Sequence, residues 1–132
     1  MNTKKVVTTV DDGSNGKISP FQYIGETEFN AFKEYDDKII VLCFTASWCG
    51  PCKQIKPVLK QIQEQRAAHC LFLFCDVDAH EEFCATHGIR AMPTFKIFRG
   101  SVLLSEFKGA NAEQLIRELT IIERSVFYSE YK

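Results

Sequence analysis

The sequence predicts an α/β protein in which a central mixed β-sheet lies between helices on both faces. Two apolar runs, Ile39–Thr45 and Leu71–Val77, lack polar alternation and therefore predict strands that are covered on both sides. Helix-compatible sequence separates the two runs, which predicts a parallel pair. Nearer the C-terminus, Thr94–Phe98 and Val102–Phe107 flank Arg99-Gly100-Ser101 and predict an antiparallel hairpin.

The remaining elements follow in chain order. Phe21–Ile24 is a short apolar run that predicts a first strand, and the next helix is predicted over Glu26–Tyr35 with Gly25 as its N-cap. A second helix is predicted from Gly50 to about Arg66, and Pro57 inside it is expected to kink it.

Two further helices complete the pattern. Ala79–His87 predicts a short helix closed by Gly88, a residue type common just after a helix end. Glu113–Glu123 predicts an amphipathic last helix, whose apolar side consists of Leu115, Ile116, Leu119 and Ile122. The predicted order is therefore βαβαβαββα.

The two ends of the chain lie outside this pattern. We interpret residues 1–20 as an N-terminal extension in which Val6–Val10 can add an edge strand before a polar loop at Asp11–Lys17. Residues 21–123 form the predicted domain. Residues 124–132 are a tail or an extension of the last helix.

Composition limits the classes of function. The chain has 132 residues, is 45% hydrophobic and carries a formal net charge of -1, from 16 Lys plus Arg against 17 Asp plus Glu. This balance predicts no binding to nucleic acid or to an anionic membrane, so we expect proteins or small thiols as partners. No apolar stretch approaches the length of a membrane span.

Six cysteines in a short chain suit either a disulfide framework or free thiols. The first 13 residues contain only a brief apolar run, interrupted by threonines and acids, and do not resemble a signal peptide. We therefore expect thiols in a reducing compartment and a cytoplasmic location.

The chemistry is predicted at Trp48-Cys49-Gly50-Pro51-Cys52, between a central strand and the start of a helix. Unpaired amides at a helix N-terminus stabilise a thiolate and lower its pKa, so Cys49 is the predicted nucleophile. Cys49 is expected to remain at the exposed helix mouth, whereas Cys52, one turn on, is expected to be shielded and is the predicted resolving thiol. Pro51 stiffens the first turn.

A zinc site and an inert structural disulfide are the two other interpretations of this pair. A zinc site normally needs a second Cys or His pair at ligand spacing, and Cys70, Cys75 and Cys84 do not provide one. His80, Cys84 and His87 fall near one helical face, but we predict no metal there. An inert structural disulfide between Cys49 and Cys52 stays the other alternative.

A second element, Met92-Pro93-Thr94, enters a strand after the loop Gly88-Ile89-Arg90-Ala91. Proline is tolerated as the first residue of a strand. From these residues alone, a trans bond before Pro93 is as much expected as a cis bond. Trp48, next to the nucleophile, suits a client contact better than simple packing.

Taken together, these residues resemble the thioredoxin family. The features that carry the resemblance are WCGPCK from Trp48 to Lys53, Pro57, the DVD run Asp76–Asp78, GIRAMPTF from Gly88 to Phe95, and Gly109 before the last helix. The resemblance covers about residues 21–123. It implies the thioredoxin fold and a cis peptide between Met92 and Pro93.

The resemblance also implies a function and partners. It implies a protein-disulfide reductase that binds no cofactor, carries a redox-active Cys49–Cys52 disulfide, and receives electrons from NADPH through a thioredoxin reductase. Clients such as peroxiredoxin or ribonucleotide reductase are expected by analogy. A client-docking groove would include Trp48, Gly50, Pro51, Arg90, Met92, Pro93 and Gly109.

The chain departs from the family at two positions. Family members usually carry a buried aspartate where this chain has Cys43, and many bacterial members carry a lysine where it has Phe74. The two changes are consistent, since Phe74 removes a cation that would lack a partner. We interpret Cys43 as a small buried hydrophobe rather than a third redox thiol.

Several alternatives remain open at this stage. Cys70, Cys75 and Cys84 are expected in the core, although Cys70 or Cys84 would permit regulatory oxidation if exposed. A secretory oxidase or isomerase is disfavoured by Gly50-Pro51. A binding module with incidental redox activity is the alternative from another functional class. The clients and the state of self-association are not predicted.

Overall fold

The computed structural model describes residues 21–128. The elements in this range are β1 (Gln22–Tyr23), α1 (Glu26–Phe32), β2 (Ile39–Thr45), α2 (Gly50–Gln65), β3 (Cys70–Asp76), α3 (Glu81–Thr86), β4 (Thr94–Arg99), β5 (Val102–Lys108) and α4 (Ala112–Phe127). The order is the predicted one. The strand suggested at Val6–Val10 lies outside the described residues.

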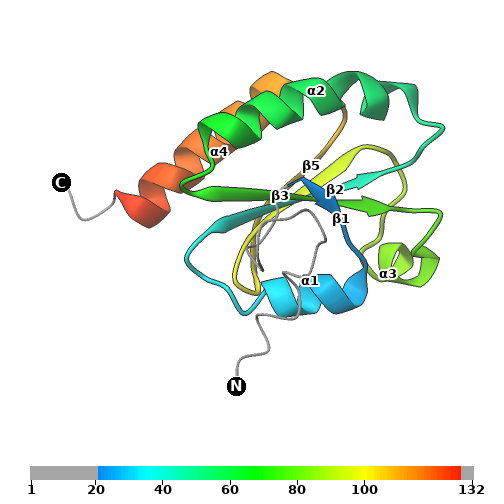
Figure 1. Ribbon diagram of the computed structural model, residues 1–132, viewed down its shortest axis with the longest axis horizontal. Coiled ribbons are helices and arrows are strands. Elements are labelled where there is room, and N and C mark those ends of the chain that lie inside the picture. The colour runs from blue at the N-terminus through cyan, green and yellow to red at the C-terminus, as the bar shows by residue number, and fades with distance from the viewer. Residues whose placement is uncertain (1–20, 129–132) are drawn as a thin grey trace, which may run out of the picture.

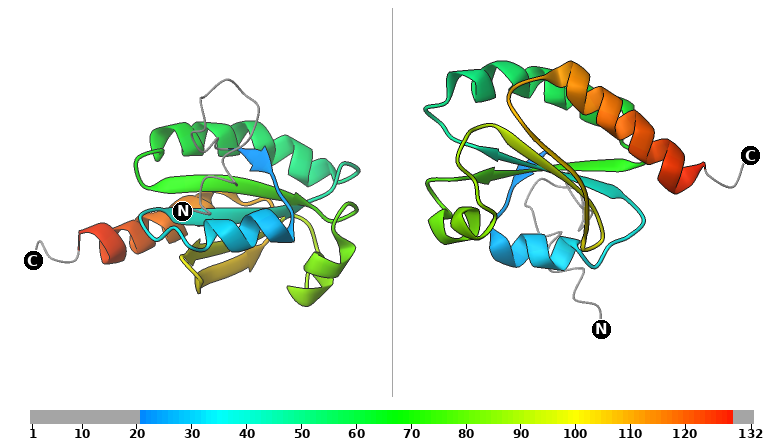
Figure 2. Two further views of the ribbon diagram at one scale, coloured as in Figure 1. Left: turned by 60° about the horizontal axis from the view of Figure 1, so that its bottom comes forward. Right: turned by 180° about the vertical axis from the view of Figure 1, so that it is seen from behind.

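The five strands form one mixed sheet in the order β1-β3-β2-β4-β5. β1 and β2 run parallel to β3, whereas β4 is antiparallel to both β2 and β5. Figure 1 shows α2 and α4 on one face of the sheet and α1 and α3 on the other, and the reverse view in Figure 2 agrees. The predicted fold class is therefore confirmed.

Each face of the sheet has its own core because successive side chains of a strand point to opposite sides. In β2, Ile39, Val41 and Cys43 join the cluster under α2 and α4. The alternate residues Ile40, Leu42 and Phe44 join the cluster over α1 and α3. Every residue of β2 is buried, as its unbroken apolar sequence predicted.

Two helices are shorter than predicted, α1 at its end and α3 at its start, for local reasons. α1 stops at Phe32 instead of Tyr35 because the N–H groups of Glu34 and Tyr35 bond to carbonyl oxygens only three residues back. α3 begins at Glu81 instead of Ala79, since the N–H groups of Ala79 and His80 both bond to the Asp76 carbonyl in a preceding turn.

The remaining bounds differ by smaller amounts, apart from the last helix. β3 is shifted by one residue, and its ladder with β2 pairs Ile39 with Cys70. α2 continues through Pro57 as one 16-residue helix. α4 extends to Phe127, whose ring stacks on His69 with centroids 4.3 Å apart. No helix within residues 21–128 is long and apolar enough to cross a membrane.

Gln63 is a buried polar side chain that completes the edge of β3. β1 covers only part of this edge, pairing at Leu73 and Phe74. Beyond it, the Gln63 amide accepts the Phe72 N–H at 2.6 Å and donates to the Cys70 carbonyl at 3.1 Å. The side chain thus replaces a neighbouring strand for two buried backbone groups.

We predict that Gln63→Leu destabilises the chain by about 1–3 kcal/mol, because two buried backbone groups lose their partners while the apolar volume is kept. Gln61→Leu, on an exposed position of the same helix, is the matched control and should change the free energy of unfolding by less than about 0.5 kcal/mol. Urea unfolding of both variants measures this. Equal stability of the two would contradict the assigned role.

Candidate active site

The two cysteines of the WCGPC sequence lie where the central strand leads into α2. Cys49 is the N-cap residue of that helix, and its sulfur accepts the Cys52 backbone N–H at 3.3 Å. The two residues are joined by a disulfide, with Cα atoms 5.3 Å apart. Pro51 lies in the first turn, where its missing N–H costs no helical hydrogen bond.

The start of α2 makes this environment electropositive. The first amides of a helix have no partner within it, and their aligned dipoles favour a negative charge at the N-cap. The first turn contains no acidic residue that would oppose this effect. The predicted difference in exposure between the two cysteines is not found. In the disulfide state Cys49 is 6% exposed and Cys52 is 5% exposed.

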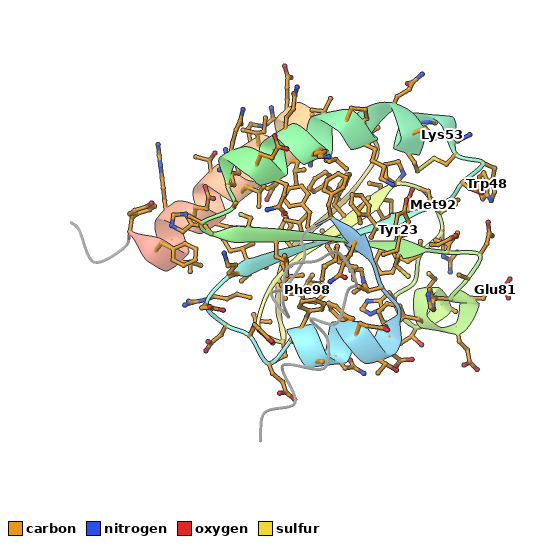
Figure 3. The ribbon with its side chains drawn as sticks, in the orientation of Figure 1. Tyr23, Trp48, Lys53, Glu81, Met92 and Phe98 are labelled. Atoms are coloured by element: carbon orange, nitrogen blue, oxygen red, sulfur yellow. A yellow bond between two sulfur atoms is a disulfide. The ribbon has the colours of Figure 1, made fainter. Side chains whose placement is uncertain are left out.

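The second predicted element lies directly beside this disulfide. The peptide bond between Met92 and Pro93 is cis, as the family resemblance implied. The Met92 carbonyl oxygen is 3.6 Å from Cys49 Sγ. The Met92 side chain packs against the cluster of Ala46, Cys49 and Cys52. Figure 3 shows Met92, Trp48 and Lys53 at this end of the molecule.

Trp48 is held in place by a residue to which sequence reasoning gave no role. Its indole N–H donates to the Asp78 carboxylate at 2.8 Å, although the ring stays 63% exposed. Asp78 follows β3 and belongs to the DVD run, which signals the family but does not reveal this contact. The hydrogen bond fixes the orientation of a large apolar surface next to Cys49.

The other predicted groove residues lie around the same site. The Gly109 N–H donates to the Pro93 carbonyl at 2.9 Å, and Gly109 has a φ of 101°, which L side chains rarely adopt. Gly50 is exposed at the first position of α2. Arg90 is exposed in the loop that precedes Met92.

Cys43 and Phe74 are neighbours beneath this site. They are paired in the β2–β3 register, and each is only 2% exposed. Burial raises the pKa of the Cys43 thiol, and the charge of Lys56 opposes this only weakly. Cys43 is therefore a neutral thiol at physiological pH and a poor proton acceptor.

The Lys56 ammonium lies beside this pair and contacts aromatic rings. The Lys56 ammonium lies 4.4 Å from the centroid of the Tyr23 ring and 5.2 Å from that of Phe74. It also donates to the Tyr23 hydroxyl at 2.6 Å. Phe74 thus stabilises a nearby cation through its ring face.

His80, Cys84 and His87, which fall near one helical face in the sequence, do not form a metal site in the structure. Nδ1 of His87 is 3.1 Å from the Lys96 ammonium, and Cys84 contacts Cys75. Burial and the positive charge of Lys96 lower the pKa of His87. Within residues 21–128, no three His, Cys, Asp or Glu side chains form a group that could hold a metal ion.

A cysteine pair at a helix start, beside a cis-proline loop and on a mixed sheet covered on both faces, defines a thiol-disulfide oxidoreductase. The profile of the thioredoxin family matches residues 21–121. Thioredoxin from Ovis aries is 41% identical over 93 residues, which span 70% of this chain and 86% of that protein. Human thioredoxin is 41% identical over 66% of this chain and 80% of its own length.

Solved structures agree with these matches. Thioredoxin from Trypanosoma brucei brucei superposes with a TM-score of 0.74 at 29% identity, over 80% of this chain and 92% of its own. Deadhead, a germline-specific thioredoxin of Drosophila melanogaster, has a TM-score of 0.62 at 38% identity, over 64% and 81% of the two chains. The chain belongs to the thioredoxin family, whose members need no bound cofactor.

We predict that the neutral Cys43 thiol makes stability fall at alkaline pH. Above about pH 9 this thiol ionises in the unfolded chain but not in the folded one, because burial raises its pKa. The unfolded state then binds fewer protons, so the free energy of unfolding falls by up to about 1.4 kcal/mol per pH unit for each such thiol.

Cys43→Ser, which removes the titrating group, should show a shallower fall than the native chain in anaerobic urea unfolding between about pH 8 and pH 10. The hydroxyl lowers stability at every pH, so the slopes rather than the absolute values are compared. Identical slopes in the two chains would contradict a thiol that is neutral because it is buried.

Proposed function

We propose that this chain reduces disulfides in client proteins, with Cys49 as nucleophile and Cys52 as resolving thiol. The supporting observation is the position of Cys49 as N-cap of α2, where its sulfur accepts the Cys52 backbone N–H at 3.3 Å. A sulfur in that position is stabilised as a thiolate, the form that attacks disulfides.

The reaction transfers two electrons and ends in the observed disulfide. The Cys49 thiolate attacks one sulfur of the client disulfide, a mixed disulfide forms, and the other client sulfur leaves as a thiolate. Cys52 then loses its proton and attacks Cys49 Sγ, which releases the second client thiol. The product is the Cys49–Cys52 disulfide, whose sulfurs need no large backbone movement to bond, given Cα atoms 5.3 Å apart.

Client docking is assigned to the surface around Cys49. The exposed Trp48 ring supplies apolar contact area, and the half-buried Met92 carries a backbone carbonyl oxygen 3.6 Å from Cys49 Sγ. An extended client segment can bond to this backbone. Gly50 and Pro51 are exposed beside it, Gly109 is half-buried and Pro93 is buried, and the exposed Arg90 offers a charge at its edge.

The chain would be reduced again by a thioredoxin reductase that draws electrons from NADPH. Disulfide-bearing enzymes such as peroxiredoxin or ribonucleotide reductase are the proposed clients, and the cytoplasm is the proposed location. Sequence similarity to thioredoxins supports these partners.

We predict that insulin-disulfide reduction with NADPH and a thioredoxin reductase is lost, by at least about 100-fold, in both Cys49→Ser and Cys52→Ser, because each substitution removes one electron-carrying sulfur. Cys52→Ser should also accumulate a mixed disulfide with the client, visible by mass spectrometry. Cys70→Ser, which changes a thiol outside the site, is the control and should retain activity. Trapping of the client in Cys49→Ser would reverse the assigned roles.

We predict that release of the mixed disulfide is strongly pH-dependent, because the buried neutral thiol of Cys43 cannot take the Cys52 proton. Below the pKa of an ordinary thiol the thiolate fraction rises about tenfold per pH unit, and the release rate should follow it between about pH 6 and pH 8.

Cys43→Asp, which restores a carboxyl beneath the pair, should flatten this profile. Single-turnover release of a labelled client peptide from both chains measures the effect. A native release rate that stays constant over this pH range would contradict the absence of an internal base.

A further inference from the structure

Two further cysteines lie in contact on the opposite face of the sheet from α2. Cys75 belongs to β3 and Cys84 to α3, nine positions later in the chain. Their sulfur atoms are 3.9 Å apart, and both side chains belong to the cluster between the sheet and the helices α1 and α3. Neither takes part in the chemistry assigned to Cys49 and Cys52.

At this distance the two thiols form an S–H···S hydrogen bond, in which either sulfur can donate. A disulfide requires the sulfurs to approach to about 2.05 Å, which is a further movement of about 2 Å. α3 has only six residues and follows a turn, so little regular structure has to move with Cys84. The other free thiols have different surroundings: Cys43 packs among apolar side chains, and Cys70 Sγ lies 3.5 Å from the Glu123 carboxylate.

We propose that Cys75 and Cys84 form a second redox-active dithiol, which hydrogen peroxide converts into an intramolecular disulfide. The Cys84 thiolate attacks the peroxide and becomes a sulfenic acid, with release of hydroxide. Cys75 then attacks that sulfur, and water leaves as the S–S bond forms. Two thiols and one peroxide give one disulfide and two waters, so two electrons are transferred.

The order of these steps follows from the two environments. Cys84 is 5% exposed and Cys75 is fully buried, so peroxide reaches Cys84 first. Burial raises the pKa of both thiols, but the hydrogen bond from Cys75 stabilises the Cys84 thiolate. Cys75 is in place to resolve the sulfenic acid, because it already contacts the same sulfur.

The segment between the two cysteines connects this pair to the active site. It contains Asp78, which holds the Trp48 indole at 2.8 Å. It also contains Val77, whose N–H donates to the Thr45 carbonyl at 2.9 Å and whose side chain packs against the cluster of Ala46, Cys49 and Cys52. A Cys75–Cys84 bond closes this segment into a ring and draws its two ends together.

The test begins with the chain in its Cys49–Cys52 disulfide form, in which Cys43, Cys70, Cys75 and Cys84 are the free cysteines. After peroxide treatment, free thiols are alkylated in denaturant and counted by mass. We expect a loss of two of the four thiols, restored by dithiothreitol. Cleavage after Glu81 or Glu82 then gives two peptides joined through Cys84, and fragment ions locate the partner at Cys75.

Matched variants separate this site from nonspecific oxidation. Cys84→Ser and Cys75→Ser should each keep their remaining free thiols without forming the intramolecular bond, whereas Cys70→Ser should still lose two. Mapping of the native chain decides the proposal even where a serine variant folds poorly. It is overturned if Cys75 and Cys84 remain alkylatable, or if Cys84 is found only as a sulfinic or sulfonic acid.

A second readout tests the connection to the active site. Trp48 is the only tryptophan in the chain, so its emission reports on that position alone. We expect the emission spectrum to shift when the second disulfide forms and to return with dithiothreitol, with no shift in peroxide-treated Cys84→Ser. An unchanged spectrum in chains that carry the mapped disulfide would overturn the coupling to Trp48.

Discussion

Burial of β2 on both faces fixes where Cys49 lies. All seven residues of this strand are buried, and its neighbours β3 and β4 hold it in the centre of the sheet. The chain can leave such a strand only at its end, where α2 begins with Cys49 as N-cap. The Cys49 sulfur thus lies at a helix terminus on a rigid support. Met92 and Gly109 reach the same end because β4 pairs with β2 and β5 pairs with β4.

The replacement of an acid by Cys43 is accommodated by its surroundings. A lone lysine or carboxylate at such a depth would be a costly unpaired charge. Here Phe74 lies opposite a neutral thiol, and the Lys56 ammonium lies over the rings of Tyr23 and Phe74. The core beneath the site is therefore satisfied without a buried ion pair. In the proposed reaction, Cys52 therefore loses its proton without help from Cys43.

The sequence predicted the features that are local in the chain. Unbroken apolar runs located β2 and β3, and the WCGPC sequence at a strand-to-helix junction located the reactive pair. Contacts between residues distant in the chain were not predicted from the sequence. The hydrogen bond from the Phe72 N–H to Gln63 joins residues 9 positions apart, and that from Trp48 to Asp78 joins residues 30 positions apart. Neither separation is a period of a helix or a strand. The contact between Cys75 and Cys84 likewise depends on how α3 packs on the sheet.

We propose that the start of α2 makes Cys49, and not Cys52, the reactive thiol. The most direct measurement reduces the chain, exposes it to a limiting amount of iodoacetamide near pH 7, and locates the first alkylated residue by peptide mass mapping. We expect modification at Cys49, with Cys52 and the other buried thiols unmodified, because helix amides favour the thiolate of the N-cap residue. First modification at Cys52, or equal modification of both, would contradict it.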